Sequence, residues 1–264
     1  MNKKEKIALS IAIITKNEEK RLPDCLTSVS FADDIVIVDS GSIDYTVKIA
    51  EDFGCRVFKE NWKGYGPQIN SAVAKCKNDW VLILDADERI PPETKEDIVK
   101  IIQNPSADAY SFPRRNYLHG RWIKHSDWWP DRVTRLARKS NGQLHGRTHG
   151  KWITKGDLKA VKNPIDHFSF SSYSDMLKKL DQYSTAASKE LFRQGKRTNI
   201  FVPLCHGFGM FIKIYFFKKG FLDGFDGFII ALTKAAGSFF KYVKLLELQC
   251  GYTQVYSEKK LLKG

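Results

Sequence analysis

The N-terminal half contains the run Trp80-Val81-Leu82-Ile83-Leu84-Asp85-Ala86-Asp87-Glu88-Arg89, in which five apolar residues are followed at once by acidic ones. Such an apolar run is typical of a strand that is buried on both faces of a parallel sheet. The strand would deliver Asp85 and Asp87 to the carboxyl edge of the sheet, where open α/β folds bind ligands. In an extended chain the two side chains lie on the same side, and paired carboxylates suit Mg²⁺ or Mn²⁺. A solvated turn after a core strand fits the same residues.

Segments around this run alternate between strands and helices. The apolar runs predict strands at 7–14, 34–39 and 55–58. Helices are expected at about 23–30, 42–53, 67–76 and 92–103. Strands that alternate with helices form βαβ units and a parallel sheet. The sequence therefore predicts an α/β fold with a mostly parallel sheet flanked by helices.

Polar side chains follow three of these strands, in the groups Thr15/Asn17/Glu18, Asp39/Ser40 and Asp85/Asp87. Right-handed βαβ connections bring such strand ends to one edge of the sheet, so together they indicate a binding crevice. The chain has neither the G-x-G-x-x-G of a dinucleotide fold nor the G-x-x-x-x-G-K-[ST] of a P-loop. A metal ion would therefore supply most of the charge that neutralises a phosphate at this edge.

The net charge of +13 is unevenly distributed along the 264 residues. Residues 1–110 carry 15 basic and 19 acidic side chains, whereas residues 111–264 carry 28 and 11, a balance of +17. The second half should therefore meet a phosphate-bearing substrate, a nucleic acid or a membrane surface. Five cysteines without a C-x-x-C pair indicate reduced thiols in a cytoplasmic protein. No signal peptide is expected, because Lys16-Asn17-Glu18-Glu19 interrupts the first apolar segment.

Residues 166–264 are expected to form a helical region beside a first domain of residues 1–165. Residues 171–195 have a helical pattern, and 201–217 and 220–248 combine many Phe and Tyr residues with recurring lysines. These lysines are too frequent for a membrane-spanning helix. Aromatic-rich, lysine-edged helices fit a membrane interface, with their cations toward anionic head groups. A helical subdomain packed on the sheet is the alternative.

Candidate catalytic groups lie in the later part of the expected first domain. Asp131 is surrounded by tryptophans and arginines, where a carboxylate can act as a general base or form a salt bridge to Arg132 or Arg135. The same arginines could bind a phosphate. His145 and His149 have no cysteine nearby, so a zinc site is not expected.

Together these motifs resemble family 2 glycosyltransferases of the GT-A fold, and specifically bacterial lipopolysaccharide-core glucosyltransferases. The resemblance is close over residues 7–93 and looser around Trp129-Pro130-Asp131 and in the C-terminal helices. It is carried by Ile13-Ile14-Thr15-Lys16-Asn17-Glu18-Glu19, Val36-Ile37-Val38-Asp39-Ser40-Gly41-Ser42, Gly64-Tyr65-Gly66-Pro67-Gln68-Ile69-Asn70 and Leu84-Asp85-Ala86-Asp87-Glu88.

The resemblance implies an inverting, metal-dependent enzyme that moves a hexose from a UDP-sugar to a lipid-linked glycan such as the lipopolysaccharide inner core. Glucose is the expected hexose. It implies these nucleotide-site residues: Thr15, Asn17, Glu18, Asp39, Gln68, Asn70 and Asp85. Asp39 would accept the uracil N3–H. Asp87, with Asp85, would hold Mg²⁺ or Mn²⁺, which would act as a Lewis acid on the departing UDP.

An inverting mechanism also needs a general base. Related sequences carry Val-His-Glu where this chain has Thr148-His149-Gly150, so the glutamate is missing. Asp131 is therefore the first candidate for the base and His149 is the second. The expected location is the cytoplasmic face of the inner membrane, with the protein bound peripherally to the anionic surface.

Other functions remain open at this point. The acceptor could be an undecaprenyl-linked or capsular saccharide, or a protein side chain. A nucleotidyltransferase would also pair carboxylates with nucleotide phosphates, although residues 15–19 lack the glycines of its loop. A basic nucleic-acid-binding protein would explain the charge of the second half, but the chain contains no known reader motif, so no nucleic acid is expected.

Overall fold

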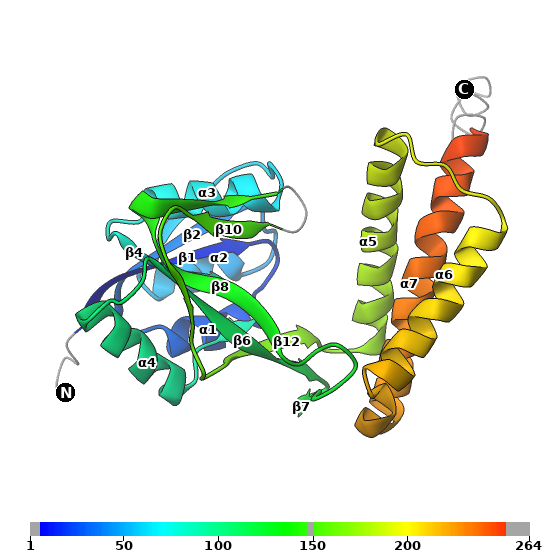
Figure 1. The fold of residues 1–264 in the computed structure, drawn as a ribbon. Coiled ribbons are helices and arrows are strands. Elements are labelled where there is room, and N and C mark those ends of the chain that lie inside the picture. Colours follow the sequence, from blue (N-terminus) through cyan, green and yellow to red (C-terminus); the bar gives the residue numbers. More distant parts are fainter. Residues whose placement is uncertain (1–5, 147–149, 252–264) are drawn as a thin grey trace, which may run out of the picture. The chain divides into compact units, whose positions relative to one another are not determined.

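The structure is a computed structural model, and it describes residues 6–146 and 150–251. The chain divides into two compact units (Figure 1). The first unit comprises residues 1–116 and 130–169, and the second comprises residues 117–129 and 170–264. Each unit is described by itself below.

The first unit begins with the predicted βαβ units. Its elements are β1 (Ile7–Thr15), α1 (Leu22–Ser28), β2 (Ala32–Asp39), α2 (Thr46–Asp52), β3 (Arg56–Lys59), α3 (Tyr65–Lys75) and β4 (Trp80–Asp85). The four strands are parallel and have the order β3-β2-β1-β4. The α/β fold class expected from the sequence is thereby confirmed.

The strand register brings the polar strand ends into line. Thr15 pairs with Asp39 across β1 and β2, and Ile14 pairs with Asp85 across β1 and β4. The last residues of three strands therefore lie side by side at the carboxyl edge. Asp87 lies in the turn that follows β4, so the extended chain expected through residues 85–87 ends at Asp85.

A mostly antiparallel part continues the sheet beyond β4. It contains β5 (Glu88–Arg89), α4 (Pro92–Gln103), β6 (Ala109–Leu118), β8 (Asp131–Arg138), β11 (Leu158–Ala160) and β12 (Ile165–Phe170), and the hairpin β9 (Gly142–His145) and β10 (Lys151–Thr154) forms a separate sheet. The strand order is β4-β8-β6-β12-β5. The sequence did not predict β8, because Arg132, Arg135 and Arg138 interrupt its apolar pattern.

Apolar side chains fill both faces of the sheet. Along β1, Leu9, Ile11 and Ile13 pack on one face with residues of α1, α2 and α4. Ala12 packs on the opposite face, where α3 contributes Ile69. This alternation is that of a strand buried on both sides, and it fixes which residues end at the polar edge.

The second unit is mainly helical. It contains β7 (Arg121–Trp122), α5 (Tyr173–Arg193), α6 (Phe201–Ile212), the π-helical turn η2 (Lys213–Phe217), the 3₁₀ turn η3 (Gly220–Asp223) and α7 (Gly224–Cys250). The expected C-terminal helical extension is therefore present. None of its described helices is long and apolar enough to span a membrane.

Residues 117–129 pack with these helices, although the expected domain boundary at residue 165 placed them in the first domain. Ile123 and Trp128 share an apolar cluster with Ile214 and Ile230. Buried Asp223 fixes the same segment, since its carboxylate accepts hydrogen bonds from the backbone nitrogens of residues 124 and 125 and from the hydroxyl of residue 126.

Candidate functional site

Asp39 ends β2 and is almost fully buried. Its Oδ1 accepts hydrogen bonds from the backbone nitrogens of Gly41 and Ser42 at 3.0 and 2.9 Å. Its Oδ2 accepts from the hydroxyls of Thr15, at 3.0 Å, and Ser42. Burial opposes ionisation, but these hydrogen bonds outweigh it and lower the pKa of Asp39. All four acceptor positions are occupied, so a uracil N3–H would replace a hydroxyl that can rotate away.

The loops after β1 and β2 are joined at the residues predicted to hold the nucleotide. Asn17 has a left-handed backbone, with φ of 57°. Its nitrogen donates to Ser42 Oγ at 2.8 Å, and its Oδ1 accepts from the nitrogen of Ile43 at 2.9 Å. The nitrogen of Glu18 donates to Thr46 Oγ1 at 2.7 Å. Both backbones are therefore fixed beside Asp39.

Asp85 has partners of its own at the end of β4. Tyr65 donates its hydroxyl to Oδ1 at 3.1 Å, and Arg135 forms an ion pair with Oδ2. Arg135 is 4% exposed and also contacts the fully buried Glu88 at 2.5 Å. Burial alone would lower the pKa of Arg135, but the two carboxylates outweigh it and raise that pKa well above its usual value. Arg135 therefore forms ion pairs with both Asp85 and Glu88.

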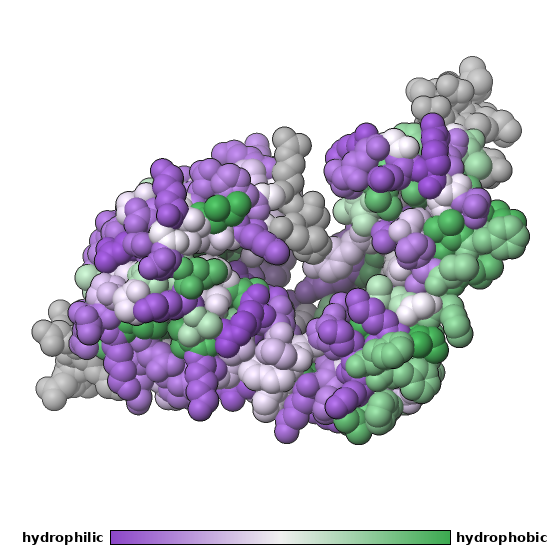
Figure 2. All heavy atoms as spheres, in the orientation of Figure 1, coloured by the Kyte–Doolittle hydropathy of each residue, from purple (hydrophilic) through white to green (hydrophobic). Residues whose placement is uncertain are grey.

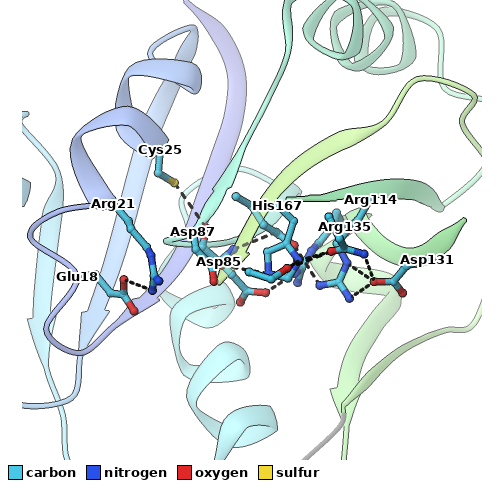
Figure 3. A network of polar contacts seen from close by, with 12 residues as sticks. Glu18, Arg21, Cys25, Asp85, Asp87, Arg114, Asp131, Arg135 and His167 are labelled. Atoms are coloured by element: carbon cyan, nitrogen blue, oxygen red, sulfur yellow. Dashed lines mark hydrogen bonds and ion pairs between the residues drawn. The ribbon is translucent and has the colours of Figure 1, made fainter. Parts of the chain in front are cut away.

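Asp131, the first residue of β8, forms its ion pair with Arg114 of β6. The Nε and Nη2 of Arg114 contact Asp131 Oδ2 at 2.9 and 2.5 Å, and its Nη1 contacts Glu88 at 3.3 Å. A salt bridge to Arg132 or Arg135 was one of the two alternatives for Asp131, but Arg132 donates to backbone carbonyls of residues 111 and 161. The sequence could not show this pairing because Arg114 lies 17 residues away on another strand. Ion pairs thus link Asp131 to Arg114, Glu88, Arg135 and Asp85 in turn, with acidic and basic side chains alternating (Figure 3).

Asp87 faces His167 of β12, and their Oδ1 and Nε2 atoms lie 3.5 Å apart (Figure 3). His167 Nδ1 lies 2.6 Å from Asn116 Oδ1, and the amide nitrogen of Asn116 donates to Asp131 at 3.4 Å. Asn116 thus holds the imidazole through Nδ1, while Nε2 faces Asp87. An imidazole whose second nitrogen is held by a polar side chain is the usual arrangement of a metal-binding histidine.

The two residues of α3 that were predicted to hold the ribose or diphosphate differ in their contacts. Gln68 is fully buried, and its Oε1 accepts from the nitrogen of Lys63 at 3.2 Å. Its amide nitrogen has no hydrogen-bond partner among the described residues. Both amide atoms of Asn70 bind the backbone of Leu144, at 2.8 and 2.9 Å. The buried amide nitrogen of Gln68 is therefore not used by any described residue, whereas Asn70 holds β9.

Buried polar atoms without a partner occur elsewhere at this edge. Within the described part of the chain they include Ser40 Oγ and Arg135 Nε. Buried donors in folded proteins are nearly always satisfied, so an unsatisfied group needs an explanation such as a ligand. Their neighbours Asp39 and Asp85 are the acids predicted to lie at the nucleotide.

Sequence reasoning missed several polar side chains of this network: Tyr65, Glu88, Arg114, Asn116 and His167. One signal was present, because Arg114 and Asn116 alternate on β6 and His167 and Ser169 alternate on β12, so each pair lies on one face. The pairing of β6 with β12, which brings the two faces together, has no local signature. His149, the second candidate base, lies outside the described residues.

Among the described residues, no group of three or more His, Cys, Asp or Glu side chains could hold a metal. Asp87 and His167 could supply two ligands to a metal ion. Metal sites in phosphate-transferring enzymes commonly use one or two protein ligands and complete the shell with substrate phosphates and water. An imidazole beside a carboxylate suits Mn²⁺ better than Mg²⁺.

Comparison with known proteins identifies a family and several relatives. The family model for glycosyl transferase family 2 matches residues 10–160. An uncharacterized glycosyltransferase of Rickettsia bellii is 32% identical over 258 residues, which cover 92% of this chain and 88% of the relative. The lipopolysaccharide core biosynthesis glycosyltransferase LpsC of Rhizobium meliloti is 29% identical over 255 residues, which cover 92% and 93%.

Among solved structures, this chain is similar in fold to S. aureus TarS 1–349 in complex with UDP-GlcNAc. The structural match covers 94% of this chain and 92% of the TarS chain. The sequence identity is 15% and the TM-score is 0.48.

Proposed function

This chain belongs to glycosyl transferase family 2 and is therefore a glycosyltransferase, and we propose that it is an inverting, metal-dependent enzyme that moves glucose from UDP-glucose to a lipid-linked glycan such as the lipopolysaccharide inner core. The observation that carries the proposal is the row of strand ends Thr15, Asp39 and Asp85, which continues into Asp87 and His167. It combines polar groups for a nucleotide with ligands for a metal.

The donor site is built from the loops after β1, β2 and β4. Asp39 accepts the uracil N3–H, while Thr15, Asn17 and Glu18 shape the wall around the base. The unused donor on Gln68 and the unpaired atoms of Ser40 and Arg135 bind oxygen atoms of the ribose or diphosphate. We assign Asn70 a structural role, because Leu144 uses its amide.

Asp87 and His167 would hold Mn²⁺. The bound metal would neutralise the negative charge that develops on the diphosphate leaving group. Asp85 would lie next to this metal site, with its carboxylate held in place by Arg135 and Tyr65. Asn116 orients the imidazole through Nδ1.

Asp131 is the proposed general base. Its Oδ2 is held by Arg114 and Asn116, which fixes the carboxylate in position. The acceptor hydroxyl gives its proton to Asp131 as its oxygen bonds to the anomeric carbon. The bond from that carbon to the diphosphate oxygen breaks at the same time, and UDP leaves. His149 remains the second candidate.

The acceptor is inferred from the relative and from charge. LpsC carries the name of a lipopolysaccharide core enzyme, and the basic half of this chain, with a balance of +17, suits a phosphate-bearing acceptor. A lipid-linked acceptor also places the enzyme at the cytoplasmic face of the inner membrane.

Transfer assays test the proposal. The purified protein is incubated with Mn²⁺, a panel of UDP-hexoses and either lipopolysaccharide truncated in the inner core or an undecaprenyl-linked saccharide, and the product is analysed by mass spectrometry. We expect the addition of one hexose from UDP-glucose. Transfer only to undecaprenyl-linked saccharides, or no transfer from any UDP-sugar, would contradict the proposed acceptor or donor, respectively.

A further inference from the structure

The second unit exposes large apolar side chains on α6, on the two turns after it and on the start of α7. We call this set the apolar face, and it comprises Ile200, Phe201, Leu204, Phe208, Phe216, Phe217, Phe221, Leu222, Phe225, Phe228 and Leu232. Phe208, Phe217 and Phe225 are 71%, 78% and 68% exposed. Soluble monomers rarely expose contiguous apolar patches larger than a few hundred Å².

Helical spacing arranges these residues in stripes. Phe201, Leu204 and Phe208 follow one another at intervals of three and four on α6, and Phe225, Phe228 and Leu232 do the same on α7. Residues at such intervals share one face of a helix. The two helices pack against each other and are joined by η2 and η3, which carry the remaining aromatic residues. Figure 2 shows apolar residues gathered over α6 and these turns.

Cations accompany the apolar face. Lys213, Lys218, Lys219 and Lys234 are all exposed within the same segment. Two of the carboxylates nearby already have partners. Asp223 accepts hydrogen bonds from the segment around residue 125, and Asp226 is bound by Arg121 and Tyr173. Aromatic side chains beside lysines therefore form a cationic, apolar surface.

We propose that the apolar face docks on an anionic lipid bilayer. Phenylalanines at the η2–η3 turn enter the boundary between head groups and acyl chains, and the lysines bind anionic head groups. A second copy of the chain would bring lysines against lysines, so charge favours the bilayer as the occupant. The inference deepens the proposed function, because it names the surface through which an enzyme with a lipid-linked acceptor would reach it.

Vesicle sedimentation tests this docking with the full chain. Liposomes of phosphatidylcholine alone are compared with liposomes that also contain phosphatidylglycerol, and we expect clear binding only to the second kind. The variant Phe216→Ser/Phe217→Ser/Phe225→Ser should lower the partition coefficient at least tenfold. Leu177→Ser/Tyr183→Ser/Phe192→Ser, which changes exposed residues of α5, is the matched control and should leave it within about twofold.

A second variant tests the charge. Lys213→Gln/Lys219→Asn/Lys234→Gln changes only exposed side chains and should lower binding to anionic vesicles about fivefold per lysine. Equal binding to both kinds of vesicle would overturn the role of the lysines, and unchanged binding of the phenylalanine variant would overturn the docking surface. The docking surface would also be overturned if the wild type formed a concentration-dependent dimer and the phenylalanine variant were a monomer.

UDP affinity of every variant is measured in parallel and should stay unchanged, because the substitutions lie outside the first unit. A variant that loses vesicle binding but still binds UDP would show that the apolar face is needed for docking and not for the nucleotide site. If the wild type does not bind UDP, the proposed function is contradicted, whatever the vesicle result.

Discussion

The two units differ in what they bury and in what they leave exposed. In the first unit, charged groups such as Glu88 and Arg135 are buried and paired, and a few polar atoms at the sheet edge lack a partner among the described residues. In the second unit, large apolar side chains such as Phe217 and Phe225 are exposed. Buried polar atoms without a partner and exposed apolar side chains both cost free energy in the isolated chain. The first pattern favours a polar ligand at the first unit, and the second favours an apolar partner at the second unit.

Asp131→Asn should have the largest effect, because it removes the proposed proton acceptor. We expect kcat to fall by about 10²- to 10⁴-fold with little change in UDP affinity. Asp166→Asn is the matched control, since Asp166 also pairs with an arginine of β6, Arg115, at 2.6 Å. A loss of less than tenfold in the transfer assay would remove Asp131 from the role of base.

Arg135→Leu tests whether the buried charges of the first unit depend on one another. The substitution leaves the fully buried Glu88 and the half-buried Asp85 without this cation, which should lower the free energy of unfolding by about 3–5 kcal/mol. Arg138→Leu, on the same strand, removes a more exposed pair with Asp79 and should cost less than about 1 kcal/mol. Urea denaturation that shows equal losses for the two variants would contradict this difference.

Asn116→Ala sharpens the assignment of the metal ligands. Without the amide oxygen, the imidazole of His167 loses its 2.6 Å contact at Nδ1, and Mn²⁺ affinity in the presence of UDP should fall about 10- to 100-fold. Asn163→Ala, whose amide binds Asp97, serves as the control. Unchanged Mn²⁺ binding in a calorimetric titration would exclude a positioning role for Asn116.

Acid should affect the first unit before the second. Hydrogen bonds and ion pairs lower the pKa of six carboxylates in the first unit: Asp33, Asp34, Asp39, Asp44, Glu60 and Asp79. Lys75 and Ser71 lower the pKa of Glu60 to about 2. A folded-state pKa below the unfolded value of about 4 means that the unfolded chain binds more protons. The stability from these groups is present above about pH 4 and is lost as the pH falls toward 2.

Hydrogen exchange measured from pH 5 to pH 2 checks this expectation. Peptides from β1–β4 should lose protection at a higher pH than peptides from α7. Glu60→Gln should lower stability at pH 6 and have no effect near pH 2. Simultaneous loss of protection in both units would show that their stabilities are not separate in acid.

Local patterns sufficed for the parallel part of the fold. The uninterrupted apolar runs predicted β1, β2 and β4, and the periodicity of residues 171–195 predicted α5 within a few residues. The polar strand ends also indicated which edge carries the candidate site, because parallel topology fixes where strands end.

The antiparallel strands could not be predicted in the same way. β8 and β12 carry charged or polar residues at inward positions, such as Arg135 and His167, because those residues face other charges and not an apolar core. The pairing of Asp131 with Arg114 and the contact of Asp87 with His167 depend on the order of strands in the sheet. Only tertiary structure supplies that order.

Calorimetric titration of UDP tests the nucleotide site most directly. The wild type is titrated with Mn²⁺ and then with EDTA, and Asp87→Asn is titrated with Mn²⁺. We expect UDP to bind the wild type tightly with Mn²⁺ and much more weakly in the other two cases. If UDP does not bind the wild type even with Mn²⁺, the carboxyl edge of the sheet is not a UDP site.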